Sequence, residues 1–329
     1  MTMHRPPNRW LKRVDASCYG NHALLTIAAL VLCFGLSAAP TDAFAQGRPA
    51  VVVASKLDTE AQILGNMIAL TLEGSGVPVE RRLQLGPTKI VRQALVSGEI
   101  DIYPEYTGNS AFFHDMVSDP VWKKSQSAYD TARKLDAEQK LVWLERAPAN
   151  NTWLIAVRSD LAKSENLATM EDFAALAKRS EKIKLAGSVE FVESPAALPA
   201  FETTYGFKLP RDQIVVLPGG DTAVTMRAAA QGVSGVNSAM VYGTDGAISA
   251  LGLVVMEDKQ GAQIVYEPAP VVRAAVLERY PQIAESLGKV FRTLTMTRLQ
   301  ELNAKVSVEG QLPEAVARRY LADENSCLE

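Results

Sequence analysis

Apolar runs of strand length alternate with segments of helical periodicity from residue 51 onward, and this alternation restricts the possible folds more than any other feature. Residues 51–54 form an apolar run of strand type, and residues 63–70 carry apolar side chains at helical spacing. Residues 79–85 look extended, 88–96 helical and 100–103 extended again. This β-α-β-α-β order predicts an α/β protein in which helices cover a parallel sheet.

The same alternation restarts after Asn150. The pattern predicts strands over 153–157, 183–186, 214–217 and 238–242, and helices over 170–177, 196–204 and 222–231. The last 60 residues are mostly helical in periodicity. A chain of 329 residues can hold about two domains of ordinary size. Two α/β units joined by short connections are therefore expected, rather than one large sheet.

The first 45 residues have the order of a secretory signal peptide. An apolar stretch over 23–36 is followed by small and polar residues that end in Ala43-Phe44-Ala45. The basic residues ahead of that stretch are Arg5, Arg9, Lys12 and Arg13. We expect cleavage after Ala45 and a mature protein in the periplasm. A retained membrane anchor is the alternative, whereas Leu32 argues against a lipoprotein with its lipid on Cys33.

Composition and motifs argue against several functions. The formal net charge is −3 and Lys/Arg residues form no stripe, so no nucleic-acid partner is expected. Beyond residue 45 the chain keeps one histidine, His114, and one cysteine, Cys327. No H-E-x-x-H, C-x-x-C, phosphate-loop or G-x-S-x-G motif occurs. We expect no enzyme activity, no cofactor and no metal; a secreted α/β enzyme is the remaining alternative. The turn at 219–222 suits a helix cap better than a phosphate site.

Aromatic and polar side chains gather near the predicted strand ends. Ligands of open parallel sheets bind at the carboxyl ends of strands, so this placement predicts a pocket. For any single aromatic residue, ordinary core or rim packing is the alternative. The residues are Lys56, Tyr103, Glu105, Tyr106, Trp153, Tyr242 and Tyr266.

Several segments resemble the osmoprotectant-binding proteins of ABC importers. The run from residue 55 to 109, SKLDTEAQ through DIYPEYTGN, resembles the opening of that family. APANNTW, LPAFETTYGFKL, GGDTAV, YGTDG and PAPVVR follow in the family's order, and the resemblance covers roughly residues 50–322. It implies a two-lobed α/β fold, the type II periplasmic-binding-protein fold, with a ligand cleft between lobes. The implied boundaries are lobe 1 over 46–150, lobe 2 over 151–262, and a return to lobe 1 with C-terminal helices over 263–329.

The resemblance also implies a ligand, a partner and a site. The ligand is a small osmolyte such as glycine betaine, choline or carnitine, the partner is a membrane permease, and the chain is expected to be a monomer. In this family a box of aromatic rings holds the quaternary ammonium, and polar groups hold the ligand's tail. The matching positions are Lys56, Tyr106, Asn109, Trp153, Ser194, Tyr242 and Tyr266.

Two of these positions affect the expected ligand. Ser194 stands where relatives often carry an arginine for a carboxylate, which predicts weaker binding of glycine betaine and a smaller loss for choline. A receptor of the same fold for an amino acid is the main alternative. In that case Glu105 would be the carboxylate that pairs with a primary ammonium.

Overall fold

The chain folds around two five-stranded sheets, each with its own helices. The computed structural model describes residues 49–217 and 222–328, with side chains up to residue 323. The predicted signal peptide, most of the turn at 219–222 and the side chain of Cys327 lie outside these residues.

The first sheet has the strand order β2-β1-β3-β10-β4. Its strands are β1 (Val51–Lys56), β2 (Val79–Gly86), β3 (Ile102–Tyr106), β4 (Leu141–Trp143) and β10 (Pro268–Arg273). Around it pack α1 (Thr59–Gly74), α2 (Thr88–Ser97), α3 (Asn109–Phe113), α4 (Ser125–Ala137), α11 (Ala274–Arg279), α12 (Gln282–Thr293), α13 (Met296–Ser307) and α14 (Pro313–Leu328). We call this sheet and its helices lobe A.

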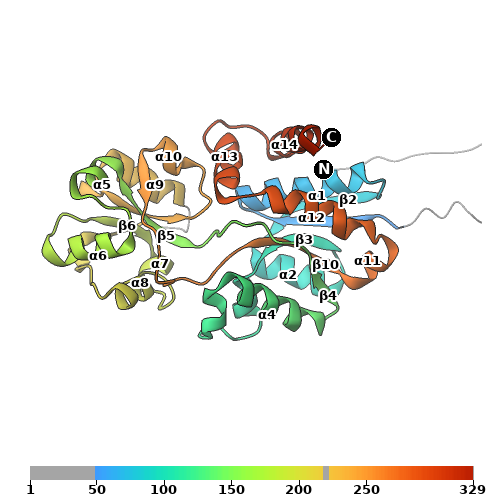
Figure 1. Ribbon diagram of the computed structural model, residues 1–329, viewed down its shortest axis with the longest axis horizontal. Helices are drawn as coiled ribbons and strands as arrows, with labels where there is room; N and C mark the ends of the chain where they lie inside the picture. The colour runs from blue at the N-terminus through green and yellow to red at the C-terminus, as the bar shows by residue number, and fades with distance from the viewer. Residues whose placement is uncertain (1–48, 218–221, 329) are drawn as a thin grey trace, which may run out of the picture. The chain divides into compact units, whose positions relative to one another are not determined.

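The second sheet has the order β7-β6-β8-β5-β9. Its strands are β5 (Trp153–Arg158), β6 (Leu185–Ser188), β7 (Ile214–Leu217), β8 (Ser238–Tyr242) and β9 (Leu253–Val255). Its helices are α5 (Ser159–Glu165), α6 (Met170–Arg179), α7 (Val189–Glu193), α8 (Leu198–Tyr205), α9 (Thr222–Gln231) and α10 (Ala247–Ala250). Short 3₁₀ turns lie at Pro120–Lys123, Arg211–Gln213 and Val233–Gly235. This sheet and its helices form lobe B (Figure 1).

The strands of the predicted β-α-β-α-β unit are parallel, and each sheet as a whole is mixed. β1 pairs in parallel with β2 and β3, but β10 runs antiparallel to β3 and β4. In the second sheet β5 is the antiparallel strand, between β8 and β9. These antiparallel strands are the first that the chain forms after it crosses between the lobes: β5 on entering lobe B, and β10 on returning to lobe A. The two-lobed α/β architecture itself was predicted correctly.

Each lobe has its own hydrophobic core. The apolar side chains of α1 and α12 pack on one face of the first sheet, and those of α2 and α4 pack on the other. Lobe B is built in the same way from α6 and α8 on one face and α9 on the other. Because no core cluster of the described residues mixes the two sheets, a movement between lobes would leave both cores intact.

Two connecting segments join the lobes and are hydrogen-bonded to each other. The Asn151 amide donates to the Tyr266 carbonyl over 2.9 Å, and the Thr152 hydroxyl donates to the Ile264 carbonyl over 2.7 Å. The segments therefore run side by side between the lobes (Figure 1). The two hydrogen bonds join the segments directly to each other.

Helix α13 adds a third contact between the lobes. It is packed in the lobe A core, yet the Gln300 side chain donates to the Gly243 carbonyl of lobe B over 2.8 Å. The approach is closest at Gly246, where an added Cβ atom would lie 2.1 Å from the Ala304 nitrogen. Only glycine allows the lobe B turn after β8 to lie against α13.

The N-terminus of helix α1 is capped by the residue directly before Thr59. Asp58 is the N-cap, and its carboxylate accepts from the Ala61 amide. This cap holds the first turn of α1, including Glu60, directly beyond the end of β1. Among the described residues, none of the helices combines the length and the apolarity needed to cross a bilayer.

Candidate functional site

The ends of four strands meet at one cavity. Lys56 ends β1 and Tyr106 ends β3, and these strands are parallel, so both side chains lie at the same edge of the first sheet. Trp153 opens β5 and Tyr242 ends β8; the two residues are direct partners across the antiparallel pair. Tyr266 comes from the connecting segment that precedes β10.

The cavity has a volume of about 1350 Å³ and is lined by both lobes. This exceeds the roughly 300–1,000 Å³ of most small-molecule sites. Six of the seven predicted site residues line it: Lys56, Tyr106, Asn109, Trp153, Tyr242 and Tyr266.

Ser194 is the predicted residue that the structure does not bring into this group. It is the C-cap of α7 and is not among the residues that line the cavity. The same helix reaches the cavity at its other end, through Glu190. The sequence pattern did not predict α7, and Ser194 was selected only by the resemblance to the family.

Two of the aromatic rings at the cavity are stacked, and its three tyrosines stay uncharged. Trp153 is nearly parallel to Tyr242, with an angle of 19° and 6.2 Å between ring centroids, and Phe191 packs edge-on against Trp153. Burial raises the pKa of Tyr242 to about 12 and raises the pKa values of Tyr106 and Tyr266 as well. Neutral rings present electron-rich faces, which attract a cation.

A glycine fixes the position of the Tyr266 ring. A Cβ atom at residue 108 would lie 2.7 Å from the Tyr266 ring, closer than carbon atoms can approach. The glycine of the DIYPEYTGN segment therefore makes room for the ring at the start of α3.

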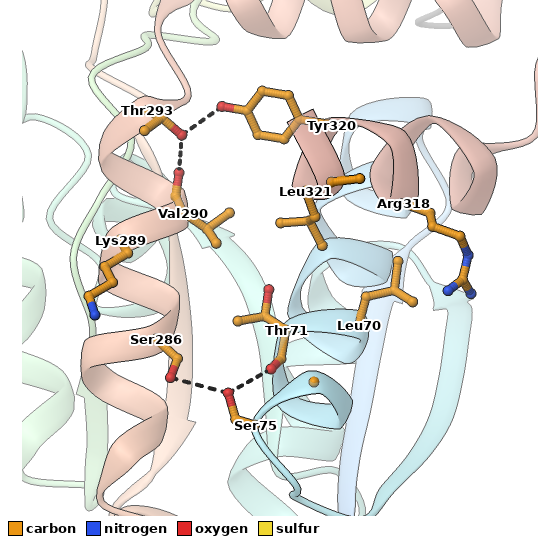
Figure 2. A pocket seen from close by; sticks show the side chains of 12 residues that line it. Leu70, Thr71, Ser75, Ser286, Lys289, Val290, Thr293, Arg318, Tyr320 and Leu321 are labelled. Atoms are coloured by element: carbon orange, nitrogen blue, oxygen red, sulfur yellow. Dashed lines mark hydrogen bonds between the residues drawn. The ribbon is translucent and has the colours of Figure 1, made fainter. Parts of the chain in front are cut away.

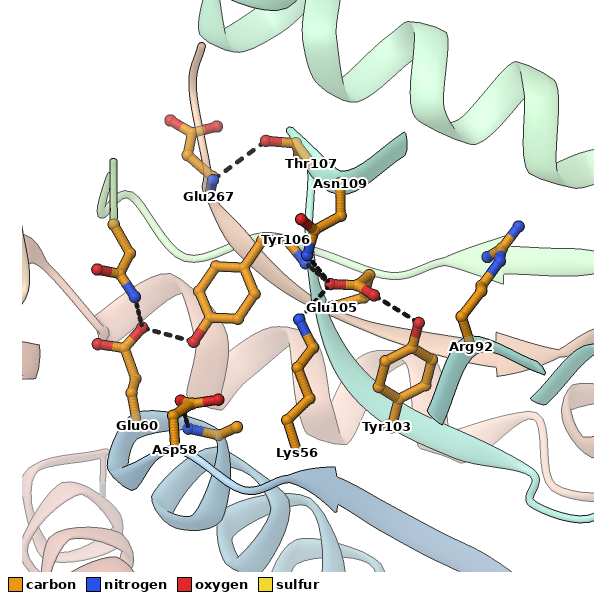
Figure 3. A network of polar contacts seen from close by, with 12 residues as sticks. Lys56, Asp58, Glu60, Arg92, Tyr103, Glu105, Tyr106, Thr107, Asn109 and Glu267 are labelled. Atoms are coloured by element: carbon orange, nitrogen blue, oxygen red, sulfur yellow. Dashed lines mark hydrogen bonds and ion pairs between the residues drawn. The ribbon is translucent and has the colours of Figure 1, made fainter. Parts of the chain in front are cut away.

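Lys56 is held by a buried carboxylate (Figure 3). Its ammonium lies 2.6 Å from Glu105 and 4.5 Å from the centroid of the Tyr106 ring. Glu105 is fully buried and also accepts from the Tyr103 hydroxyl at 2.6 Å and from Asn109 Nδ2 at 2.6 Å. The positive charge of Lys56, expected to meet the ligand's tail, is thus compensated inside lobe A.

Arg92, a second cation at the cavity, is compensated in the same way. Its guanidinium donates to both oxygens of Asp136, at 2.6 and 2.8 Å. Burial opposes the ionisation of Asp136, but hydrogen bonds from Arg92, His114 and Trp143 outweigh it and lower the pKa of this carboxyl group. Arg92 and Asp136 therefore remain a charged, mutually neutralising pair.

The carboxylates at the cavity were missed by the sequence analysis. Asp58, Glu60, Glu190 and Asp245 all line it. A signal for two of them existed, because Asp58 and Glu60 directly follow a predicted strand at its carboxyl end, where ligands of α/β sheets bind. The remaining lining cations, Lys89 and Arg227, are exposed on α2 and α9.

A second cavity of about 450 Å³ lies within lobe A, between α1, α12 and α14. Figure 2 shows that its hydroxyl groups largely bond to one another: Ser75 to Ser286 at 3.2 Å, and Thr293 to Tyr320 at 2.6 Å. None of the predicted site residues lines it. In the described ranges, no group of three or more His, Cys, Asp or Glu side chains is arranged to hold a metal ion.

Comparisons with known proteins agree on one family. Residues 49–323 match the family model described as the substrate-binding domain of ABC-type glycine betaine transport systems. The chain is 53% identical over 277 residues to the glycine betaine-binding protein YehZ of Escherichia coli, covering 84% of this chain and 91% of that protein. It is 30% identical over 277 residues to a glycine-betaine-binding protein of Pseudomonas aeruginosa, covering 82% and 86%.

Solved structures agree with this result. The structure of apo YehZ from Escherichia coli matches with a TM-score of 0.77 and 52% identity, covering 84% of this chain and 99% of that one. A structure described as a glycine betaine/carnitine/choline ABC transporter matches with a TM-score of 0.75 at 21% identity, which supports the fold alone. It covers 84% of this chain and 98% of that one.

Proposed function

Because the chain belongs to the family of substrate-binding domains of ABC-type glycine betaine transport systems, we propose that it captures a quaternary-amine osmoprotectant in the cavity between its lobes. The observation that carries the proposal is the convergence of Tyr106, Trp153, Tyr242 and Tyr266 on one cavity. A quaternary ammonium has no N–H groups to donate, so ring faces and dispersion must stabilise it. Members of the family are binding components of transporters, and the chain is not an enzyme.

The charges at the cavity favour a ligand without a carboxylate. Lys56 and Arg92 are neutralised by Glu105 and Asp136, while four carboxylates line the same space. A zwitterion such as glycine betaine would place its carboxylate near this negative charge, with only the exposed Lys89 and Arg227 to receive it. Choline carries a hydroxyl group instead and avoids this cost. Ser194 has no part in this proposal.

The amino-acid alternative loses its main support. Glu105 was the carboxylate proposed to pair with a primary ammonium, but it is buried and already binds Lys56, Tyr103 and Asn109. The side chains that donate hydrogen bonds to its oxygens all belong to lobe A.

We expect choline to bind roughly tenfold more tightly than glycine betaine. This difference is about 1.4 kcal/mol, close to the smallest free energy that a hydrogen bond to a charged group contributes. Titration calorimetry of residues 46–329 with each ligand measures this ratio. Proline tests the amino-acid alternative. Tighter binding of glycine betaine would show that a free cation holds the carboxylate, and binding of proline alone would refute the quaternary-amine site.

We further propose the setting in which the protein works. Binding proteins of ABC importers act outside the cytoplasmic membrane. Here, cleavage after Ala45 would release a monomeric protein to the periplasm, where it delivers its ligand to a membrane permease.

We also propose that the lobe boundaries lie near residues 150 and 262. The paired connecting segments that meet at Asn151–Tyr266 and Thr152–Ile264 support these limits.

A further inference from the structure

Glu60 lies where four separate parts of the chain meet. Its carboxylate is buried and accepts from the Tyr106 hydroxyl at 2.8 Å, Asn151 Nδ2 at 3.2 Å and Asn303 Nδ2 at 2.7 Å, and it is hydrogen-bonded to the Thr244 side chain. These donors come from β3, a connecting segment, α13 and the turn after β8. Figure 3 shows the contact between Glu60 and the Tyr106 hydroxyl, and the hydrogen bond with Thr244 links this ring of the cavity to lobe B.

The two amide groups that donate to Glu60 leave acceptors unused. Within the described part of the chain, Asn151 Oδ1 and Asn303 Oδ1 are buried and have no hydrogen-bond partner. An ionised Glu60 uses the two amide nitrogens. A protonated Glu60 would itself become a donor, and rotation of either amide would supply an acceptor for it. The surroundings can thus accommodate both charge states.

The surroundings of Glu60 bring its titration into the neutral range. Burial raises the pKa of Glu60 to about 7, and nearby Asp58 acts in the same direction, while the hydrogen bonds from Thr244, Tyr106 and Asn303 act against it. Among the other charged groups nearby, Lys56 is paired with Glu105, and the Asp245 carboxylate accepts a hydrogen bond from the Tyr242 amide.

We propose that Glu60 is a positioning residue of the ligand site, which in its ionised form polarises the Tyr106 ring and ties it to lobe B, so that protonation of Glu60 weakens the binding of a cationic ligand. This inference rests on the proposed function. A phenol that donates to a carboxylate has a more electron-rich ring, and the electron density of the ring determines its attraction for a cation. When Glu60 is neutral, both this polarisation and the direct attraction to the ligand are lost.

Binding of choline should therefore depend on pH and release a proton. If only the ionised form is competent, the apparent Kd rises roughly tenfold from pH 8 to pH 6, because a pKa of about 7 leaves about one molecule in ten ionised at pH 6. Choline does not titrate in this range. Calorimetry at pH 6 in buffers of different ionisation enthalpy should detect close to one proton released per choline bound.

Three variants test the assignment. Glu60→Gln, which resembles the protonated form, should bind choline at pH 8 at least as weakly as the parent does at pH 6, without pH dependence or proton release. Thr244→Val removes one donor that favours the ionised form, so it should move the midpoint of the pH profile upward. Glu181→Gln, an exposed matched change, should keep the parental profile. If Glu60→Gln and Thr244→Val both keep the parental pH profile, the inference is wrong. If Glu60→Gln does not fold, the inference is wrong when Thr244→Val leaves the midpoint of the profile unchanged.

Stability measurements separate this inference from the proposed function. A carboxyl group whose pKa is raised by folding binds its proton more tightly in the folded state, so folding becomes more favourable as pH falls through about 7. The free energy of unfolding of the parent, minus that of Glu60→Gln, should increase from pH 8 to pH 5.

If neither choline nor glycine betaine binds the parent, the proposed function is wrong whatever this difference shows. If choline binds with no pH dependence, the inference alone is wrong.

Discussion

Replacing Lys56 with methionine is expected to lower the free energy of unfolding by about 3–5 kcal/mol, because it leaves the buried Glu105 carboxylate without its counter-charge. Lys56 is 5% exposed and Glu105 0% exposed, so water cannot compensate for the loss. The second change Glu105→Gln should recover most of the stability, since a neutral amide needs no counter-ion. Urea unfolding of the single and double variants measures both effects.

Lys89→Met is the matched control. Lys89 lines the same cavity but is exposed on α2, so its replacement should change the free energy of unfolding by no more than about 0.5 kcal/mol. Equal losses in Lys56→Met and Lys89→Met would show that the pair with Glu105 does not stabilise lobe A. A double variant as unstable as Lys56→Met would assign the loss to the lysine's packing rather than to the unpaired charge.

Replacing Trp153 with alanine is expected to raise the Kd for choline by about 30-fold. Tryptophan has the strongest cation–π attraction of the aromatic side chains, about 2 kcal/mol at a desolvated site, and each 1.4 kcal/mol changes Kd tenfold. The loss also removes the support that Trp153 gives to the neighbouring Tyr242 ring, 6.2 Å away. Titration calorimetry with choline measures the change.

Two controls separate ligand contact from general damage. Trp153→Tyr keeps an aromatic ring at the position and should lose less than tenfold in affinity. Phe173→Leu removes an aromatic side chain from the lobe B core, away from the cavity, so it should lower stability and leave Kd unchanged. If Trp153→Ala binds choline as tightly as the parent, Trp153 only packs against Phe191 and Tyr242.

The strand ends could be predicted from the sequence because local patterns determine them. Apolar runs and helical periodicity located seven of the ten strands in the described part of the chain within a few residues, and the family resemblance selected the aromatic residues that line the cavity. The strands β4, β9 and β10 were not predicted; in β10, Pro268 and Pro270 disfavour strand structure. Their carbonyls still accept from Ala147 and Leu144, so the strand pairs through its acceptors.

The charges of the cavity could not be predicted because they depend on pairs far apart in the chain. Lys56 and Glu105 are 49 residues apart, and Arg92 and Asp136 are 44 apart. No periodicity links such positions, so Lys56 looked like a free cation for the ligand. Glu60 and Asn303, which are 243 residues apart, show the same limit: only the folded chain brings α13 against α1.

Calorimetric titration of the protein with choline and with 3,3-dimethylbutan-1-ol tests most directly whether the aromatic cavity recognises a quaternary cation. The alcohol has the shape of choline, with carbon in place of the charged nitrogen, and it is the more hydrophobic of the two. If neutral ring faces and surrounding carboxylates attract the charge, choline should bind at least about 30-fold more tightly, a difference of about 2 kcal/mol. Equal or tighter binding of the uncharged alcohol would show that the cavity selects apolar shape, and would contradict the account.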